Sequence, residues 1–589
     1  MNRRIAPLVL LGGLMTTTAL HALATPPAPA AAEHFRSLAS QYFTDVTFHF
    51  SPTAGTSAGL HQYDGLLEDY SQAEVERETA ALHAWEAKFD AVDASQLDES
   101  TQGDLAMVKN NIRGTLLELE VIKPWQKNPD TYSSGITGSA FSLMERNFAS
   151  QDERLKSLVE REKKMPAVFA EAKKNLTNPP KIYTEIALEQ LPGLIDFFQH
   201  DVPEAFKDAK DQHTIDEFHK TNAAVIAALG EYEQWVKTDL LPRSNGDFRI
   251  GADAFQKKLQ YDEMVDLPLD HLLDVAYADL HKNQAKFQEI AKEVDPNKTP
   301  REVLAELATI HPAPDKLLQA FHDRFDSEVG FIRSHHIITI PSDVQPTLEE
   351  TPPFMRATTQ ASMDSPGPFE KHSTTAYFNV TLPEKDWTPE HTADYMAAFN
   401  VGTIVSTSVH EAFPGHYVQF LWVNHGSLSE VRKLVTSNTN VEGWAHYCEQ
   451  MMLDQGYGQP GAGATDAREA KLIRLGQLQD ALLRDARFIV GIKMHTGQMT
   501  QEQAIDFFVK EGYQSRSIGD VETKRGTSDP TYLYYTLGKL QILKLRADVE
   551  KKEGAAFSLQ KFHDDFMKQG GAPIKIVRHA MLGDDSPTL

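Results

Sequence analysis

Two histidines and a glutamate lie within one seven-residue segment, His410-Glu411-Ala412-Phe413-Pro414-Gly415-His416. Imidazole nitrogens and carboxylate oxygens bind zinc, and a glutamate beside a bound zinc can take a proton from the metal-bound water. The familiar H-E-x-x-H arrangement puts both histidines on one helix face, because position i+4 returns to within about 40° of the start. Here the second histidine is at i+6, about 240° around a regular helix. The segment therefore predicts hydrolytic zinc chemistry only where the helix is distorted.

The two residues before the second histidine could supply that distortion. Pro414 donates no backbone hydrogen bond and clashes with the preceding turn, while Gly415 permits unusual dihedral angles. A bulge or a break there would bring His416 back beside His410. In the alternative interpretation, the Pro-Gly pair simply ends a helix and His416 is an ordinary residue beyond it. The spacing alone is compatible with both interpretations.

A third ligand is available downstream. Zinc hydrolases with two histidines from one helix commonly take a carboxylate from a following helix. The 26 positions from His416 to Glu442 allow a turn, a connector and a return helix. His446 and Glu449 follow Glu442 at i+4 and i+7, so all three could share one face. Glu449 could instead orient a ligand histidine, and we interpret His446 as an ordinary packed or surface residue.

The composition narrows the chemistry further. The chain has 589 residues, 58 Lys plus Arg and 83 Asp plus Glu, for a formal net charge of −25. Such acidity argues against a nucleic-acid partner and against docking on an anionic membrane. A hydrophobic fraction of 41% argues for large buried cores. The single cysteine, Cys448, excludes an internal disulfide and a Cys-rich zinc finger, so a metal site must use mainly histidines and carboxylates.

The first 24 residues have the pattern of a secretory signal peptide. Two arginines precede an apolar stretch, and Ala22-Leu23-Ala24 offers a small-x-small cleavage site. The apolar run is short for a membrane span, and no cysteine follows it as a lipid anchor would need. We expect cleavage near Ala24/Thr25, a flexible Pro/Ala tether over residues 25–32, and a periplasmic or secreted mature protein. No later segment has 18 uninterrupted apolar residues, so we expect no membrane association after cleavage.

The elements that must position these residues are mainly helices. Helical periodicity dominates from Glu33 to about Ile290, and again from Pro389 onward. Short β-branched segments at His336–Pro341 and Ala376–Leu382 predict two strands. The Pro/Ser/Thr-rich stretch between them, through Gly367, predicts a surface loop. The pattern therefore predicts a mostly α protein with a small β-sheet just before the metal helix.

Two strings of the sequence together resemble a known family. HEAFPGHYVQ (residues 410–419) and EGWAHY-x-E (residues 442–449) resemble the bacterial domain-of-unknown-function 885 family, which is grouped with the gluzincin-type zinc peptidases. Weaker similar patches extend the resemblance over nearly the whole mature chain: residues 51–71, 250–259, 482–495, 499–504 and 529–538.

The resemblance implies one catalytic unit over residues 33–589, with two helical lobes around a substrate channel. The mainly helical N-terminal lobe would be residues 33–335, and residues 336–589 would form the small sheet and the catalytic helical lobe. It implies one Zn²⁺ per chain. The implied roles are zinc ligands for His410, His416 and Glu442, general base for Glu411, and transition-state partners for His495 and Tyr535.

Two departures from the family pattern concern the substrate side. Gly491 stands where the family has an aspartate, and residues 530–533 read Pro-Thr-Tyr-Leu where it has P-G-Q-A.

Substrate contacts can be proposed from the residues as well. Arg484 and Arg487 are three apart on one predicted helix and could clamp a substrate carboxylate, or could form salt bridges instead. The predicted strand around Tyr377 and Asn379 could pair with a peptide as an extra strand, or could simply complete a small sheet.

Together these features predict an exported zinc-dependent metallopeptidase that hydrolyses short peptides. An exopeptidase, such as a carboxypeptidase or dipeptidase, would suit a narrow channel. The alternatives are a zinc hydrolase of a non-peptide amide or ester, and a non-catalytic peptide-binding protein that has kept the fold.

Overall fold

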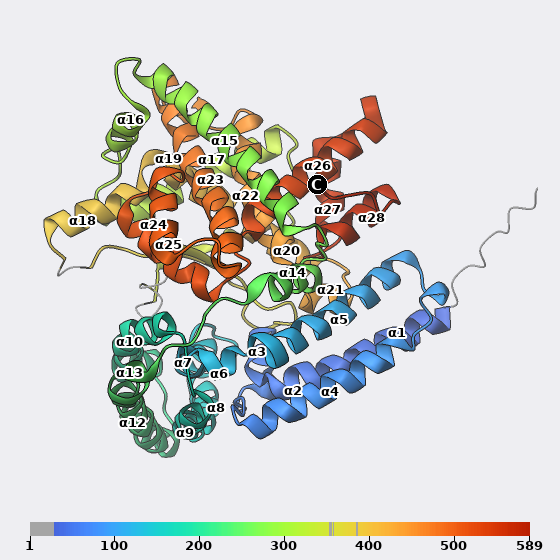
Figure 1. The fold of residues 1–589 in the computed structure, drawn as a ribbon, viewed down its shortest axis with the longest axis vertical. Coiled ribbons are helices and arrows are strands. Elements are labelled where there is room, and N and C mark those ends of the chain that lie inside the picture. The colour runs from blue at the N-terminus through green and yellow to red at the C-terminus, as the bar shows by residue number, and fades with distance from the viewer. Residues whose placement is uncertain (1–28, 353–355, 357–358, 385–386) are drawn as a thin grey trace, which may run out of the picture.

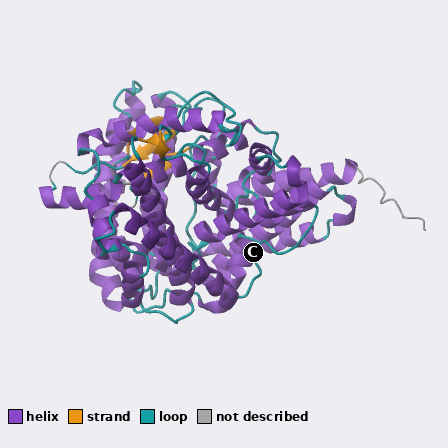
Figure 2. Cartoon of the chain, turned by 90° about the horizontal axis from the view of Figure 1, so that it is seen from above, coloured by secondary structure: helices purple, strands orange, loops and turns teal. Residues whose placement is uncertain are grey.

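The computed structural model describes residues 29–352, 356, 359–384 and 387–589. Helices make up most of it (Figures 1 and 2), which confirms the predicted class. The predicted signal peptide, residues 1–24, lies outside the described residues. Helix α1 begins at Pro29, so it includes the last part of the segment 25–32 for which we expected a tether. None of the described helices is long and apolar enough to cross a lipid bilayer.

The first helices of the chain are α1 (Pro29–Tyr42), α2 (Phe48–Phe50), α3 (Pro52–Ser57), α4 (Gln72–Asp90), α5 (Glu99–Leu117), α6 (Pro124–Lys127), α7 (Asp130–Met144), α8 (Gln151–Glu162), α9 (Met165–Asn175), α10 (Lys181–Asp196), α11 (Val202–Ala205), α12 (Gln212–Trp235), α13 (Leu241–Arg243), α14 (Gly251–Asp262), α15 (Leu269–Val294), α16 (Pro300–Leu307) and α17 (Leu317–Ser334). After the sheet follow α18 (Pro389–Met396), α19 (Val401–Glu411), α20 (His416–His425), α21 (Glu430–Leu434), α22 (Asn438–Asp454), α23 (Ala467–His495), α24 (Gln501–Lys510), α25 (Arg516–Ser528), α26 (Tyr534–Glu553), α27 (Leu559–Met567) and α28 (Ile574–Leu582).

The hydrophobic cores divide the chain differently from the predicted boundary at residue 335. One core lies almost wholly between Tyr132 and Leu240, and we call its helices, α7–α13, the small bundle. Helices α14–α16 share a second core with α23 and α26. A third core joins α1, α4, α5 and α17 to the sheet and to α19 and α22. The small bundle therefore lies below a larger body that contains both ends of the described chain (Figure 1).

The small sheet has three strands, β1 (Thr347–Glu350), β2 (Ala361–Asp364) and β3 (Tyr377–Val380), in the order β1-β3-β2. Strand β3 is parallel to β1 and antiparallel to β2. It confirms the strand predicted over Ala376–Leu382, whereas β1 and β2 both come from the stretch predicted to be a loop. A further pair, β4 (Gln459–Pro460) and β5 (Gly463–Ala464), lies elsewhere.

The strand predicted over His336–Pro341 is wrong. Ile337 and Ile338 are buried in the core, which explains the apolar pattern. The backbone of this segment forms hydrogen bonds with side chains of α27 and not with a neighbouring strand. The His563 imidazole bonds to the Ile337 carbonyl at 2.8 Å, and the Thr339 amide donates to Asp564 at 2.9 Å.

Two pairs of helices in the larger body cross with their backbones in direct contact. Helix α22 crosses α26 where Gly443 meets Gly538, and α19 crosses α23 where Gly402 meets Gly476. A methyl group on Gly443 would lie 2.5 Å from the Gly538 Cα atom, which is closer than any van der Waals contact. Only hydrogen at these positions lets the two backbones touch.

We expect Gly443→Ala to lower the free energy of unfolding by about 1–3 kcal/mol, because overpacking forces the two backbones apart. Gly330→Ala is the matched control, since Gly330 is exposed inside α17 with no atom near its missing side chain. That change should stabilise the protein by about 0.4–1 kcal/mol. Denaturant unfolding measures both values, and equal effects of the two substitutions would contradict the crossing.

Candidate metal centre

The segment with the two histidines is broken between two helices. Helix α19 ends at Glu411 and α20 begins at His416. The Gly415 amide donates to the Val409 carbonyl at 3.0 Å. A methyl group on Gly415 would lie 1.8 Å from the His410 carbonyl oxygen, so only glycine allows the chain to turn back this tightly. The predicted distortion is therefore a complete break that places the start of α20 against the end of α19.

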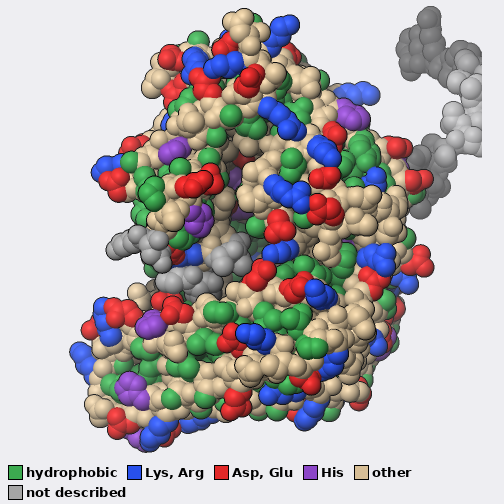
Figure 3. Space-filling model, turned by 60° about the vertical axis from the view of Figure 1, so that its left-hand side comes forward, with side chains coloured by type: hydrophobic (Ala, Val, Ile, Leu, Met, Phe, Trp, Pro, Cys, Tyr) green, Lys and Arg blue, Asp and Glu red, His purple; other side chains and the backbone are tan. Residues whose placement is uncertain are grey.

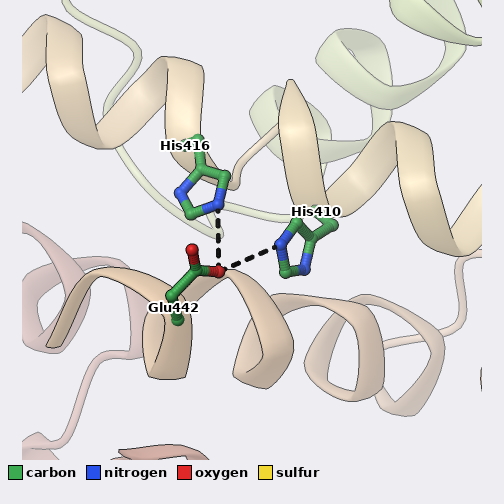
Figure 4. A group of neighbouring side chains, drawn as sticks. All are labelled: His410, His416 and Glu442. Carbon is green, nitrogen blue, oxygen red and sulfur yellow. Dashed lines mark ion pairs between the residues drawn. The ribbon is translucent and has the colours of Figure 1, made fainter. Parts of the chain in front are cut away.

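This turn brings His410 and His416 to the same carboxylate (Figure 4). The Nε2 atoms of both histidines lie 3.4 Å from Glu442 Oε2, which comes from α22. All three ligand atoms lie within 4.8 Å of one another. Two ligand atoms at about 2.0–2.1 Å from a tetrahedral zinc ion are roughly 3.3 Å apart. The spacing of the nitrogens from the carboxylate oxygen thus fits a shared zinc ion.

The charges of the cluster fit a cation as well. Glu442 Oε2 is buried, and neither imidazole contact has the geometry of a hydrogen bond. Burial raises the pKa of Glu442, but the neighbouring His416 and His410 outweigh it and lower the pKa well below its usual range. The carboxylate is therefore ionised and lacks a full partner. A divalent cation bound by two imidazoles and this oxygen would satisfy it.

A second carboxylate holds the first histidine in place. Glu449 lies on the same helix as Glu442, and its Oε1 bonds to His410 Nδ1 at 2.7 Å and pairs with the Arg484 guanidinium at 3.1 Å. Its other oxygen bonds to His446 Nδ1 at 3.1 Å. Because His410 Nδ1 is occupied in this way, Nε2 is the nitrogen that faces Glu442. The arrangement matches the orienting role predicted for Glu449, while His446 bonds to Glu449 and is fully buried.

Glu411 is the last residue of α19 and lies next to the ligand cluster. Its side chain is almost fully buried. Burial raises its pKa, while the nearby His410 and His416 act in the opposite direction. A carboxyl group with a raised pKa beside a metal site can accept a proton and release it again.

The ring of Tyr535, from α26, lies 6.4 Å from the His410 ring and nearly parallel to it. Three arginines surround that tyrosine. The Cζ atoms of Arg487, Arg484 and Arg525 lie 5.0, 5.5 and 5.8 Å from the ring centre. Tyr535 therefore lies next to the candidate metal ligand His410, in line with the family resemblance, and Arg525 is a neighbour that the sequence did not indicate.

A family profile described as "Bacterial protein of unknown function (DUF885)" matches residues 52–581. The chain belongs to the DUF885 family. A comparison with curated proteins finds no match.

Two solved structures have the fold of this DUF885 chain. A "putative lipoprotein of unknown function from Shewanella oneidensis" is 26% identical, with a TM-score of 0.77, and covers 93% of this chain and 99% of its own. A "putative lipoprotein from Colwellia psychrerythraea" is 18% identical, with a TM-score of 0.78, and covers 94% of this chain and 98% of its own. The second likeness concerns the fold alone.

Several residues predicted for the substrate side of the DUF885 site lie in other contacts. The Ile250 amide donates to His495 Nδ1 at 3.4 Å, and His495 Nε2 donates to the Gly526 carbonyl at 2.8 Å. Burial lowers the pKa of His495 to about 4, so the ring is neutral. Both ring nitrogens are therefore occupied by the main chain. His495 ties α23 to α14 and α25 and offers no free nitrogen to a substrate.

The two predicted arginine clamps also have carboxylate partners. Arg487 makes a two-pronged pair with Glu522, at 2.6 and 2.7 Å, and Arg484 pairs with Glu449. The salt-bridge alternative thus describes the contacts of both residues.

The idea that a peptide pairs with the strand around Tyr377 and Asn379 is wrong. Strand β3 is the central strand of the sheet, and both of its edges are already hydrogen bonded, to β1 and to β2. Tyr377 faces Arg146, whose guanidinium lies 5.8 Å from its ring, and Asn379 is buried. The open edges of this sheet belong to β1 and β2.

A buried carboxyl group supports the helix that carries His410. Glu328 of α17 is completely buried and accepts a hydrogen bond from Ser408 of α19 at 3.0 Å. Burial raises its pKa to about 8. The folded DUF885 chain therefore keeps this group neutral at pH values where the unfolded chain, with a pKa of about 4.3, ionises it.

We expect Glu328→Gln to become more stable relative to the wild type as the pH rises from 5 to 8. The wild type binds this proton more tightly when folded, so it loses up to about 1.4 kcal/mol of stability per pH unit in this interval, whereas glutamine does not titrate. Urea unfolding at several pH values measures the difference. The exposed Glu76→Gln of α4 is the control and should track the wild type; a pH-independent difference for Glu328→Gln would contradict the raised pKa.

Proposed function

We propose that the protein is an exported zinc-dependent metallopeptidase acting on short peptides. The observation that carries the proposal is the convergence of donor atoms from His410, His416 and Glu442 within 4.8 Å of one another, where the ionised carboxylate oxygen has no hydrogen-bond partner among the described residues. The buried Glu411 beside them supplies a base. The ligand histidines are buried, and Figure 3 shows a hollow in the surface with histidine side chains at its floor. A buried site favours short, unfolded chains over folded proteins.

Three protein ligands would leave zinc a position for water, and the ion would make that water nucleophilic at neutral pH. Glu411 takes the proton of the water as it attacks the peptide carbonyl carbon. Glu411 then gives the proton to the amine that leaves when the C–N bond breaks. Glu449 keeps His410 oriented throughout, and the Tyr535 hydroxyl is the candidate donor to the carbonyl oxygen that becomes negative.

The export part of the proposal rests on the signal-peptide pattern. The two similar solved proteins are both described as lipoproteins, a class that is transported out of the cytoplasm. We propose the same side of the membrane for this chain.

The zinc site predicts metal content. We expect about one zinc per chain after loading and dialysis, because three donors converge on one point. His416→Ala should lose the zinc, because removing one ligand weakens zinc binding at least 100-fold. His425→Ala is the control on the same helix α20, where His425 is exposed and, among the described residues, bonds to the Leu421 carbonyl. Elemental analysis by mass spectrometry counts the metal, and an unchanged zinc content in His416→Ala would refute the site.

The mechanism predicts a specific loss of turnover. We expect Glu411→Gln to lower kcat about 10²–10⁴-fold on a mixed peptide library while zinc stays bound, because the general base is gone and the ligands remain. Glu390→Gln, an exposed glutamate at the start of α18, should behave as wild type. A zinc-loaded wild type that cleaves no peptide would overturn the peptidase proposal, and cleavage of other amides or esters would redirect it.

A further inference from the structure

The three arginines around Tyr535 differ in how many hydrogen bonds and ion pairs their guanidinium groups already make. Arg487 is bound by Glu522 through two hydrogen bonds. Arg484 pairs with Glu449 and donates to the Asp480 carbonyl. Both guanidinium groups are therefore engaged by carboxylates, and the Arg484 Nε, which has no hydrogen-bond partner among the described residues, is buried.

Arg525 is bound less completely. Its Nη2 atom lies 3.3 Å from Asp529 Oδ2, from the Tyr534 hydroxyl and from the Tyr535 hydroxyl, all at the long end of hydrogen-bond distances. Within the described part of the chain, neither Nε nor Nη1 has a hydrogen-bond partner. Asp529 also accepts a closer bond, at 2.9 Å, from Tyr534. With 38% of its side chain exposed, Arg525 keeps most of its five N–H donors available to a ligand.

The distance between Arg525 and the proposed metal ligands limits the length of peptide that can lie between them. Its Cζ atom lies 5.8 Å from the Tyr535 ring centre, which lies 6.4 Å from the His410 ring centre. The guanidinium is therefore no more than about 12 Å from the His410 ring. A guanidinium–carboxylate contact takes about 4 Å of this span, and an extended chain covers about 3.3–3.6 Å per residue. The remaining distance is therefore at most about two residues.

We propose that Arg525 binds the C-terminal carboxylate of the substrate, so that the protein removes one or two residues from the C-terminus of a peptide. This inference rests on the proposed zinc hydrolase. The planar fork of an arginine matches both oxygens of a carboxylate. The substrate class is then short peptides with a free carboxylate at that end.

A cavity of about 230 Å³ lies next to the C-terminal end of α25. Thr527–Pro530, which begin two positions after Arg525, line it together with Tyr183 of α10 and Lys127 of α6. Arg525 itself is not part of this lining, so the cavity marks the meeting of α25 with the small bundle and not the carboxylate site.

A matched pair of peptide libraries tests the proposal: N-acetylated tetrapeptides made as free acids and as C-terminal amides. We expect the wild type to cleave the acids with a kcat/KM about 10- to 100-fold above that for the amides, as a charge-assisted pair allows, and to release one or two residues by mass spectrometry. Arg525→Gln should bring the acids down to the level of the amides, and Arg525→Lys should fall between. Arg516→Gln, an exposed arginine on the same helix, should keep the wild-type ratio. Equal cleavage of acids and amides by the wild type, or an unchanged ratio in Arg525→Gln with normal zinc content, would overturn the proposal.

Binding separates this proposal from the hydrolase itself. Calorimetry with Glu411→Gln should show the acids bound about 10- to 100-fold more tightly than the amides, and the added Arg525→Gln substitution should remove the difference. If the preference for acids depends on Arg525 but the zinc-loaded wild type cleaves nothing, the carboxylate site stands and the hydrolase fails. If both libraries are cleaved equally and bound equally, the hydrolase stands and the carboxylate site fails.

Discussion

Direct contact between helix backbones is the constraint on which the candidate site depends. Helix α22 carries Glu442 and Glu449, and it touches α26, which carries Tyr535, through Gly443 and Gly538. Helix α19 carries His410, and it touches α23 through Gly402 and Gly476. Side chains at these crossings would separate each pair of helices by the width of at least a methyl group. These contacts hold α22 against α26 and α19 against α23, and so fix the two helices that carry Glu442 and His410.

Bringing the helices so close buries charge, and the structure offsets this by pairing. Lys539, the residue after Gly538, is buried against Asp279 of α15 at 2.7 Å. Asp485 of α23 accepts hydrogen bonds from Asn283 of α15 and Thr536 of α26. An unpaired charge in such an interior would cost several kcal/mol. These pairs bind α15 to α23 and α26 and so attach α15 to the larger body.

The sequence predicts those features of the site and the fold that depend on residues close together along the chain. The spacing of His410 and His416, the Pro-Gly pair and the downstream Glu442 are local features, and the structure brings these three residues together. The apolar pattern of β3 is equally local. Strands β1 and β2 were missed because their pairing depends on a strand far along the sequence, and their own composition resembles a loop. The central place of β3 follows from that pairing, so no periodicity could reveal that its edges are occupied.

Arg525 shows that candidate functional residues are also missed when their role depends on contacts between distant segments. Its importance comes from the approach of α25 to Tyr535 of α26, and nothing in the residues around position 525 indicates it. His495 is the reverse case, since a histidine in a suggestive string is held by main-chain atoms of α14 and α25. Residue type and spacing identify candidate metal ligands on adjacent helices, whereas the candidate substrate contacts depend on distant segments.

Helix α25 connects the two parts of the molecule. The Tyr183 hydroxyl of α10 donates to the Thr527 carbonyl, and Glu189 of α10 pairs with Lys524. The same helix positions Glu522 under Arg487 and directs Arg525 toward Tyr535. The contacts between α10 and α25 therefore fix the position of Arg525 relative to the small bundle. Under the proposed function, a slight change in how that bundle docks would alter the length of the released fragment without replacing any candidate metal ligand.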